Sequence, residues 1–250
     1  MLKPAKQYSC QRQANPVLYS SRNFCKLPIP MSQTTIDRAR FNMIEQQVRT
    51  WDVLDQRVLD MMSAIPREAF VPERYTALAF ADTNIPLGHG QVMMAPKLEG
   101  RLLQALDIKP GDTVLEVGTG SGYVTACLAK LGKQVTSIDI IPEFTRTTET
   151  KLARLDCHNV NLETGDALGD VKTGPSYDVI AVTGSLPVLH REFHQQLNTG
   201  GRLFVITGTP PIMEALLITR IGADNWVRES LFETSIPPLL HATDAQVFDF

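Results

Sequence analysis

A glycine-rich turn carries the strongest chemical signal in this chain. It follows an apolar segment that contains an acid, and a helical pattern begins after it, in the run Val114-Leu115-Glu116-Val117-Gly118-Thr119-Gly120-Ser121-Gly122-Tyr123. Glycine adopts positive φ at little steric cost, which lets the backbone come close to a ligand. A loop of this type before a helix N-terminus holds a polar small molecule with backbone N–H groups. The turn therefore predicts a nucleoside cofactor site.

The spacing of the glycines separates the possible cofactors. The dinucleotide fingerprint is G-x-G-x-x-G, whereas this turn reads G-x-G-x-G and then has Tyr123 where the third glycine would stand. No Lys-Ser or Lys-Thr pair follows Gly122, which disfavours a triphosphate-binding P-loop. The spacing instead resembles the loop of class I methyltransferases, which have an acid two residues before the first glycine.

Three acids stand at or just beyond the ends of three successive predicted strands. Glu116 ends the first strand, Asp139 ends the second, 21 residues after Gly118, and Asp166 follows the third. Doubly wound sheets bind ligands at the carboxyl ends of their strands. A carboxylate can accept hydrogen bonds from ribose hydroxyls at Asp139 and from the adenine amine at Asp166. Each acid alone could be a solvated loop residue, but together they favour one shared ligand.

The elements that must position these acids alternate between strand and helix from Lys97 onward. The predicted strands are short and mostly apolar: Thr113–Val117, Gln134–Ile140, Val160–Thr164, Tyr177–Thr183 and Arg202–Thr207. The predicted helices lie between or before them: Lys97–Leu106, Gly122–Leu131, Pro142–Leu155 and Val188–Leu197. Two further strands, Ala215–Ile221 and Trp226–Thr234, predict an antiparallel hairpin that closes one edge. The expected fold is an α/β, doubly wound, seven-stranded Rossmann-like sheet of the methyltransferase type.

The segment before this core has a different pattern. Residues 36–65 show helical periodicity, and the apolar stripe of Ile44, Val48 and Trp51 is expected to be core. Prolines interrupt residues 66–96, where we expect a short helix at Pro72–Ala81 and ordered loop elsewhere.

Composition narrows the class of protein. The 250 residues are 43% hydrophobic with a formal net charge of −3, which indicates neither a membrane span nor a basic surface for nucleic acid. The four cysteines have no C-x-x-C spacing, which argues against a zinc site or a redox pair: Cys10, Cys25, Cys127 and Cys157. We therefore expect a cytoplasmic protein without a metal centre, and the sequence leaves its oligomeric state open.

The chain is expected to divide into three parts. Residues 1–30 contain five basic residues, no acid and several prolines, which favours a disordered basic tail or a mis-assigned start before Met31. Residues 31–96 are expected to form N-terminal helices and a substrate-covering segment. Residues 97–250 are expected to form the core that binds the cofactor.

Several motifs resemble the protein-L-isoaspartate O-methyltransferase family. The resemblance runs from about Arg57 to Leu239 and rests on the runs Ile65–Pro72, Ala81–Gln91, Leu115–Tyr123, His158–Val160 and Gly165–Asp166. The first two runs are more specific than the glycine turn, because unrelated methyltransferases lack them. The resemblance implies S-adenosylmethionine as cofactor. It also implies a repair enzyme that methylates the carboxylate of isoaspartyl residues in damaged proteins.

The resemblance and the strand-end acids together predict the site residues. The expected cofactor-binding residues come from the turn and the next two strand ends: Glu116, Gly118, Thr119, Gly120, Ser121, Gly122, Asp139, Ile140, Asp166 and Ala167. The glycines would hold the methionine end, Asp139 the ribose and Asp166 the adenine edge. His89 and Gln91 are expected to contact the substrate, within a segment that covers the reacting methyl group.

One position departs from the family pattern. After its Gly-x-Gly-Gln turn the family carries Thr-(Ile/Val)-Ser-x-Pro, with the serine at the active site, but this chain reads Gln91-Val92-Met93-Met94-Ala95-Pro96. Met94 stands at the serine position and is therefore the candidate catalytic position, although a thioether cannot donate a hydrogen bond. Met93 and Met94 could fill the core or line an altered, more apolar pocket.

Two other functions stay open at this stage. The first is a methyltransferase of the same fold with a different acceptor, such as a small carboxylic acid or another metabolite. The second is a non-catalytic module that binds S-adenosylmethionine and regulates a partner. A nicotinamide-dependent dehydrogenase is a more distant alternative, because the glycine spacing disfavours a dinucleotide.

Overall fold

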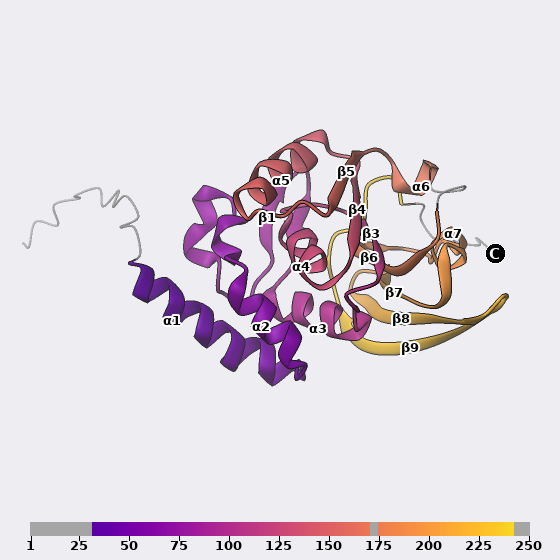
Figure 1. The fold of residues 1–250 in the computed structure, drawn as a ribbon, viewed down its shortest axis with the longest axis horizontal. Coiled ribbons are helices and arrows are strands. Elements are labelled where there is room, and N and C mark those ends of the chain that lie inside the picture. The colour runs from indigo at the N-terminus through magenta and orange to yellow at the C-terminus, as the bar shows by residue number, and fades with distance from the viewer. Residues whose placement is uncertain (1–31, 171–174, 243–250) are drawn as a thin grey trace, which may run out of the picture.

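A seven-stranded sheet forms the centre of the protein in the computed structural model, which describes residues 32–170 and 175–242 (Figure 1). The strand order is β5-β4-β3-β6-β7-β8-β9. Five strands are parallel: β3 (Thr113–Val117), β4 (Gln134–Asp139), β5 (Val160–Thr164), β6 (Tyr177–Leu186) and β7 (Leu197–Thr209). β8 (Ile212–Gly222) and β9 (Asn225–Thr234) continue the sheet in antiparallel pairing. The predicted doubly wound fold with a C-terminal antiparallel hairpin is confirmed.

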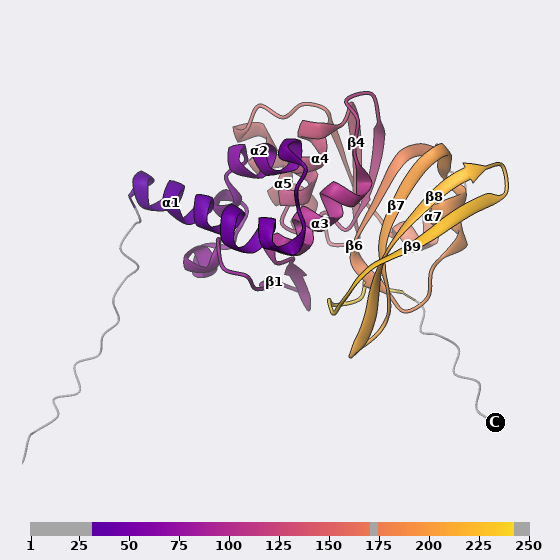
Figure 2. The same ribbon diagram turned by 90° about the horizontal axis from the view of Figure 1, so that it is seen from below.

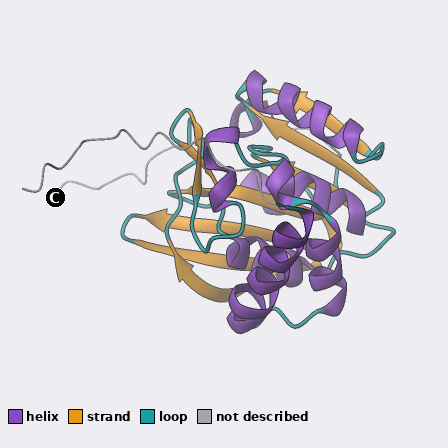
Figure 3. Ribbon diagram, turned by 90° about the vertical axis from the view of Figure 1, so that its left-hand side faces the viewer, coloured by secondary structure: helices purple, strands orange, loops and turns teal. Residues whose placement is uncertain are grey.

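Helices cover the two faces of this sheet unequally. The described helices are α1 (Gln33–Met43), α2 (Gln56–Ala64), α3 (Pro96–Leu106), α4 (Tyr123–Leu131), α5 (Pro142–Arg154), α6 (Ala167–Asp170) and α7 (Arg191–Gln195). Figure 2 shows α1 and α2 outside α3 and α4, at the opposite end of the molecule from the β8–β9 hairpin. Figure 3 shows the strands as a twisted layer with helices packed against it.

The pleat of the strands assigns neighbouring residues to opposite faces. Val114 and Val179 are fully buried in the larger core, together with residues of α2, α3 and α4. Leu115 and Ile180 belong to a second core, which includes Phe193 of α7. This alternation follows from the two-residue period of a strand. It also decides which side chains of β3 can face the glycine turn and which face α4.

The N-terminal helices differ in part from the sequence prediction. The predicted helical stretch is interrupted after Trp51, because Asp52 adopts left-handed backbone with φ 58°. Asp55 then caps α2 by accepting a hydrogen bond from the Arg57 N–H at 2.9 Å. The expectation that Trp51 lies in the core was wrong, since 36% of it is exposed. Its ring packs edge-on against Phe232.

The segment before α3 contains a hairpin that the sequence did not indicate. Strands β1 (Ile85–Gly88) and β2 (Gln91–Met93) pair antiparallel in residues that we expected to be loop. The predicted short helix is present as the 3-10 helix Glu73–Leu78. The division of the chain at residues 96 and 97 stays a prediction, and the predicted tail 1–30 lies outside the described residues.

Several element boundaries in the C-terminal half also differ from the prediction, since β7 begins at Leu197 and β8 at Ile212. The predicted helix Val188–Leu197 is limited to Arg191–Gln195, because Leu197 already pairs with Tyr177 as the first residue of β7. β6 continues past Thr183 to Leu186, so its predicted end was too early. Strand pairing therefore takes precedence over local helical pattern here.

Within the described ranges, no helix combines the length and the apolar character that crossing a bilayer requires.

Arg202 of β7 ties the sheet to the end of α3. Its Nε donates to the Leu106 carbonyl at 2.8 Å, and its Nη2 donates to the Asp107 carbonyl at 2.6 Å and to Asp112 Oδ2 at 2.8 Å. We expect Arg202→Met to lower the free energy of unfolding by about 1.5–3 kcal/mol, because three acceptors lose a charged donor. Urea denaturation measures this change.

Arg228→Met is the matched control. Arg228 is largely exposed and pairs with Glu214, its Nη2 donating to Oε2 at 3.0 Å. Its loss should change stability by about 0.5 kcal/mol or less. Equal effects of the two substitutions would contradict the role given to Arg202.

Candidate active site

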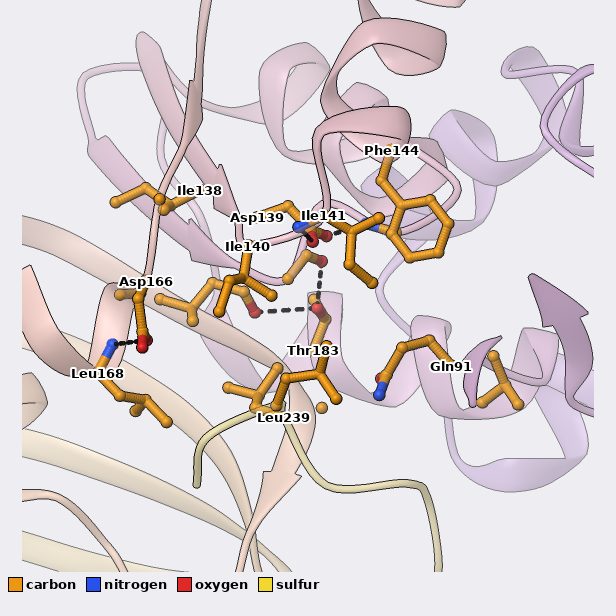
Figure 4. Close-up of a pocket in the computed structure, with 18 residues that line it drawn as sticks. Gln91, Ile138, Asp139, Ile140, Ile141, Phe144, Asp166, Leu168, Thr183 and Leu239 are labelled. Atoms are coloured by element: carbon orange, nitrogen blue, oxygen red, sulfur yellow. Dashed lines mark hydrogen bonds between the residues drawn. The ribbon is translucent and has the colours of Figure 1, made fainter. Parts of the chain in front are cut away.

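A cleft opens at the carboxyl ends of β3, β4, β5 and β6 (Figure 4). The cleft contains about 560 Å³ of space, which includes its opening to solvent. This is where the strand order reverses between β3 and β6, the place where open α/β sheets bind ligands. The walls come from strand ends, α5, β2 and the C-terminal segment: Gln91, Val92, Val117, Gly118, Gly120, Ile138, Asp139, Ile140, Ile141, Phe144, Gly165, Asp166, Ala167, Leu168, Thr183, Gly184, Leu239 and Leu240.

The glycine turn forms one wall of the cleft and needs its glycines for steric reasons. Gly118 has φ +98°, and a Cβ there would stand 2.5 Å from Thr183 Oγ1. Gly122 has φ +83°, and a Cβ there would stand 2.5 Å from Thr148 Oγ1. Any other residue would strain the backbone and collide with a buried neighbour. The turn therefore presents bare backbone to the cleft.

Asp139 joins the glycine turn to the next strand end. Its Oδ2 accepts a hydrogen bond from the Gly120 N–H at 2.9 Å, and its Oδ1 accepts one from the Ile141 N–H at 2.9 Å. Burial raises the pKa of this carboxyl group, and the backbone donors oppose the rise. Each carboxylate oxygen can accept a second hydrogen bond. Asp139 can therefore shape the turn and still receive ligand hydroxyls.

Asp166 lies across the cleft at the end of β5. Its Oδ1 accepts a hydrogen bond from the Leu168 N–H at 3.0 Å, and its Oδ2 lies 2.8 Å from His241 Nδ1. Burial acts to raise the pKa of Asp166, but the hydrogen bonds from His241 and Leu168 outweigh it, so the pKa lies below its ordinary value. Ile140 and Ala167, also predicted, line the cleft beside the two acids.

Glu116 is placed differently from the other predicted acids. Successive side chains of β3 point to opposite faces of the sheet. Glu116 therefore points under the turn toward α4 and does not line the cleft. Its Oε2 accepts hydrogen bonds from Thr125 Oγ1 at 2.5 Å and Ser137 Oγ at 2.6 Å. It is fully buried, and burial raises its pKa to about 8, although the two hydroxyl donors oppose the rise. Glu116 is therefore placed to support the turn from below.

A smaller cavity continues the cleft beneath the β1–β2 hairpin. Its empty volume is about 280 Å³, and it shares some residues with the large cleft: Val92, Gly118, Gly120 and Thr183. The predicted residues Thr119 and Ser121 line this cavity, whereas Gly122 lines neither space. The rest of its wall comes from β2, α3 and α4: Met93, Met94, Glu99 and Val124.

The methionine pair combines both roles left open by the sequence. Met93 is 3% exposed and Met94 is 4% exposed, and both belong to the larger core. Both also line the small cavity beside the glycine turn. They are therefore core residues that also give this cavity an apolar wall.

The β1–β2 hairpin contacts α5 and the C-terminal segment beside the cleft. His89, in left-handed backbone at φ 53°, places Nε2 3.2 Å from Glu143 Oε2 of α5 and packs edge-on against Phe144. Gln91 Nε2 donates to the Pro238 carbonyl at 3.2 Å. Gln91 lines the cleft, but His89 does not, so the structure brings only one of the two predicted substrate residues to its wall.

The cleft contains residues that the sequence did not predict, among them Thr183, Phe144 and Leu239. Thr183 of β6 donates from Oγ1 to the carbonyls of Val117, at 3.0 Å, and Gly118. Phe144 and Leu239 add apolar walls from α5 and the C-terminal segment (Figure 4). The predicted end of β6 at Thr183 was the available signal, but only the strand order shows that β6 lies beside β3.

Across residues 32–170 and 175–242, no cluster of three or more His, Cys, Asp or Glu could hold a metal ion.

Comparison with known proteins establishes the family. The family model described as protein-L-isoaspartate(D-aspartate) O-methyltransferase (PCMT) matches residues 38–231. The chain belongs to the PCMT family. The Protein-L-isoaspartate O-methyltransferase 1 of Rhodopseudomonas palustris is 36% identical over 214 residues, which cover 85% of this chain and 87% of the relative. The Protein-L-isoaspartate O-methyltransferase of Koribacter versatilis is 37% identical over 205 residues, covering 82% and 91%.

Solved structures share the fold of this PCMT family member. A Plasmodium falciparum chain, described as a PCMT in complex with S-adenosyl-L-homocysteine, aligns with a TM-score of 0.67 and 21% identity. The alignment covers 80% of this chain and 97% of that one. A second structure, named protein-L-isoaspartate O-methyltransferase, aligns with a TM-score of 0.70 at 22% identity, covering 82% of this chain and 67% of that one. At these identities the likeness is one of fold.

Glu116 should make the stability of this PCMT family member depend on pH. Its pKa is about 8 in the folded protein, against an ordinary value of 4.5. The stability associated with this group is fully present below pH 4.5 and is lost as the pH rises through 8, because only the unfolded chain ionises in that window. We expect the loss to reach about 3–5 kcal/mol, at about 1.36 kcal/mol for each pKa unit.

Glu116→Gln removes the titration while keeping an oxygen for Thr125 and Ser137. Urea denaturation between pH 5 and pH 8.5 should show the variant gaining stability relative to the natural protein as the pH rises. Parallel stability profiles for the two proteins would contradict the neutral, buried Glu116.

Proposed function

We propose that this chain is an S-adenosylmethionine-dependent protein-L-isoaspartate O-methyltransferase that esterifies the carboxylate of isoaspartyl residues in damaged proteins. Family membership and the names of relatives at 36–37% identity support this function. The observation that carries it is the meeting of the bare glycine turn with Asp139 and Asp166 at the reversal of strand order. That arrangement is suited to an adenosine group.

The residues of the cleft fit the proposed cofactor part by part. Asp139 has acceptor capacity left for the ribose hydroxyls, and Asp166 can accept from the exocyclic amine of adenine. Ile140, Ala167 and Leu168 provide apolar surface for the base. The backbone at Gly118 and Gly120 leaves room for the methionine end to pass toward the small cavity.

The charge of the cleft favours a cationic nucleoside over a phosphorylated one. The described residues that line the large cleft include two Asp and no Lys or Arg. A pyrophosphate or triphosphate would bring negative charge to two carboxylates, and no Lys or Arg among these lining residues would offset it. A sulfonium carries positive charge, which two nearby carboxylates favour. This supports S-adenosylmethionine against a nicotinamide dinucleotide.

The protein needs to orient the acceptor more than to activate it. When bound, S-adenosylmethionine supplies an electrophilic methyl group. An acceptor carboxylate is already ionised at pH 7, so no general base is required. Asp139 and Asp166 would hold the nucleoside, and the bound cofactor would supply its methyl group to the acceptor oxygen, with the electron pair of the broken carbon–sulfur bond left on sulfur. The β1–β2 hairpin and Phe144 would align the acceptor and exclude water, and alignment can supply about 7–11 kcal/mol.

We place this reaction in the cytoplasm, on protein or peptide substrates. Cys127 and Cys157, the cysteines among the described residues, are both free thiols, as is typical of a reducing compartment. The chain's formal net charge of −3 gives no reason to expect a nucleic-acid partner.

A second candidate is a methyltransferase of the same fold that acts on a small carboxylic acid. Met94 and Met93 favour it, because they line the small cavity with thioethers where the family serine would supply a hydroxyl. The acceptor therefore has to be tested directly, with both classes of substrate.

A methyl-transfer assay tests the proposed function. The purified chain is incubated with methyl-labelled S-adenosylmethionine and a peptide that contains one isoaspartyl residue, with the normal aspartyl peptide as control. We expect base-labile label, released as methanol, on the isoaspartyl peptide alone. Label on a small carboxylic acid in place of the peptide would favour the second candidate. Absence of any methyl ester, with cofactor binding intact, would favour a non-catalytic binding module.

Met94 should limit the rate on the isoaspartyl peptide. Met94→Ser supplies the missing donor, and Met94→Ala creates a similar space without one. We expect kcat/KM of the serine variant to exceed that of the alanine variant about tenfold, the effect of a hydrogen bond to a charged group. Both substitutions should lower stability by about 2–3 kcal/mol, because a buried side chain is shortened. Equal kcat/KM values would show that the hydroxyl has no role here.

A further inference from the structure

The small cavity contains an acid that neither the sequence motifs nor the cofactor assignment uses. Glu99 lies in the first turn of α3, and its side chain is 1% exposed. It lines the cavity together with Met94 and the backbone of the glycine turn. Its Oε2 accepts a hydrogen bond from Arg67 Nη1. Its Oε1 accepts none from any residue that the structure describes.

Arg67 makes no hydrogen bond to the second oxygen, because other contacts hold its guanidinium group in place. Its Nε donates to the Ala79 carbonyl at 2.9 Å, and its Nη2 donates to the Met94 carbonyl at 2.7 Å. Its guanidinium also stacks over the Tyr123 ring at 5.1 Å. Arg67 is fully buried, so these contacts fix its position. In the Arg67–Glu99 ion pair, Oε2 of Glu99 is therefore held by Arg67, whereas Oε1 is left without a donor.

A buried carboxylate oxygen without a donor is unfavourable in a folded protein. Burial raises the pKa of Glu99, and the Arg67 guanidinium opposes that rise. Tyr123 and Cys127 of α4 are the other titratable groups close to Glu99, and burial raises the pKa of both well above the ordinary value. Neither brings a positive charge to Oε1. A ligand that carries a cationic donor into the cavity would satisfy it.

The connection between the two spaces identifies that donor. The small cavity meets the large cleft at Gly118 and Gly120. A nucleoside with its ribose at Asp139 and its base at Asp166 therefore has its far end at Glu99. In S-adenosylmethionine that end carries one ammonium and one carboxylate group. Glu99 attracts the ammonium and repels the carboxylate.

We infer that Glu99 accepts a hydrogen bond from the α-ammonium group of the cofactor, and so selects nucleosides with an intact amino-acid end. This inference rests on the proposed function, since it assumes the adenosine site described above. It predicts poor binding of adenosine thioethers that lack the amino group. It also gives a direct role to a residue of α3 outside the glycine turn and the strand-end acids.

Calorimetric titration of the full chain with two ligands tests this inference. One ligand is S-adenosylhomocysteine, and the other is the same molecule without its α-amino group. We expect the natural protein to bind the deaminated ligand about ten- to a hundredfold more weakly, the range for hydrogen bonds to charged groups. Glu99→Gln should weaken S-adenosylhomocysteine by a similar factor and leave the deaminated ligand unchanged. Glu229→Gln, on the exposed surface of β9, is the matched control and should change neither affinity.

The other outcomes each have a defined meaning. Equal binding of both ligands by the natural protein would overturn the inference and leave the cofactor site intact, and this comparison needs no variant to fold. If Glu99→Gln weakens S-adenosylmethionine but not S-adenosylhomocysteine, Glu99 faces the sulfonium and the inference is overturned. If the natural protein binds neither ligand, the proposed function and the inference both fail.

Discussion

The hydrogen bond between the Gly120 N–H and the Asp139 carboxylate is the constraint on which the site depends. It joins the turn after β3 to the end of β4, while the second oxygen of Asp139 holds the start of α5 through the Ile141 N–H. Gly120 follows β3, and the strand order reverses between β3 and β6. The two contacts of Asp139 fix the glycine backbone at one wall of the cleft and leave acceptor sites for a ligand. The carboxylate of Asp139 therefore both fixes the backbone around the cleft and forms part of its wall.

The pleat of β3 and the packing below the turn support this arrangement. Val117 faces the cleft, whereas Glu116 points under the turn and binds the hydroxyls of Thr125 and Ser137. Thr119 of the turn lies 2.7 Å from the Ser137 hydroxyl, so the network reaches the turn itself. Buried hydrogen-bonded networks of this kind hold a loop in one conformation. The buried polar network therefore supports the glycine turn on the side of α4. On the side of the cleft, the wall consists of Asp139, Asp166 and apolar side chains.

Much of the fold followed from local pattern, because the parallel strands are short, buried and apolar. The sequence placed Asp139 and Asp166 at the ends of adjacent strands, and the structure brings both to the cleft. The same reasoning grouped Glu116 with them, since the position of an acid along a strand does not show which face it occupies. The β1–β2 hairpin escaped notice because each strand has only three or four residues. Thr183 and Glu99 depended on tertiary contacts, between β6 and β3 and between α3 and the glycine turn, that no local pattern reveals.

We propose that the cleft over β3, β4, β5 and β6 binds an adenosyl amino acid through Asp139 and the glycine turn. Titration of S-adenosylhomocysteine into the natural protein and into Asp139→Asn tests it most directly, with nicotinamide dinucleotide as the competing ligand. We expect binding of S-adenosylhomocysteine but not of the dinucleotide, and an affinity about tenfold or more weaker in the variant, because asparagine has one acceptor oxygen in place of two. Unchanged affinity in Asp139→Asn, or a preference of the natural protein for the dinucleotide, would contradict it.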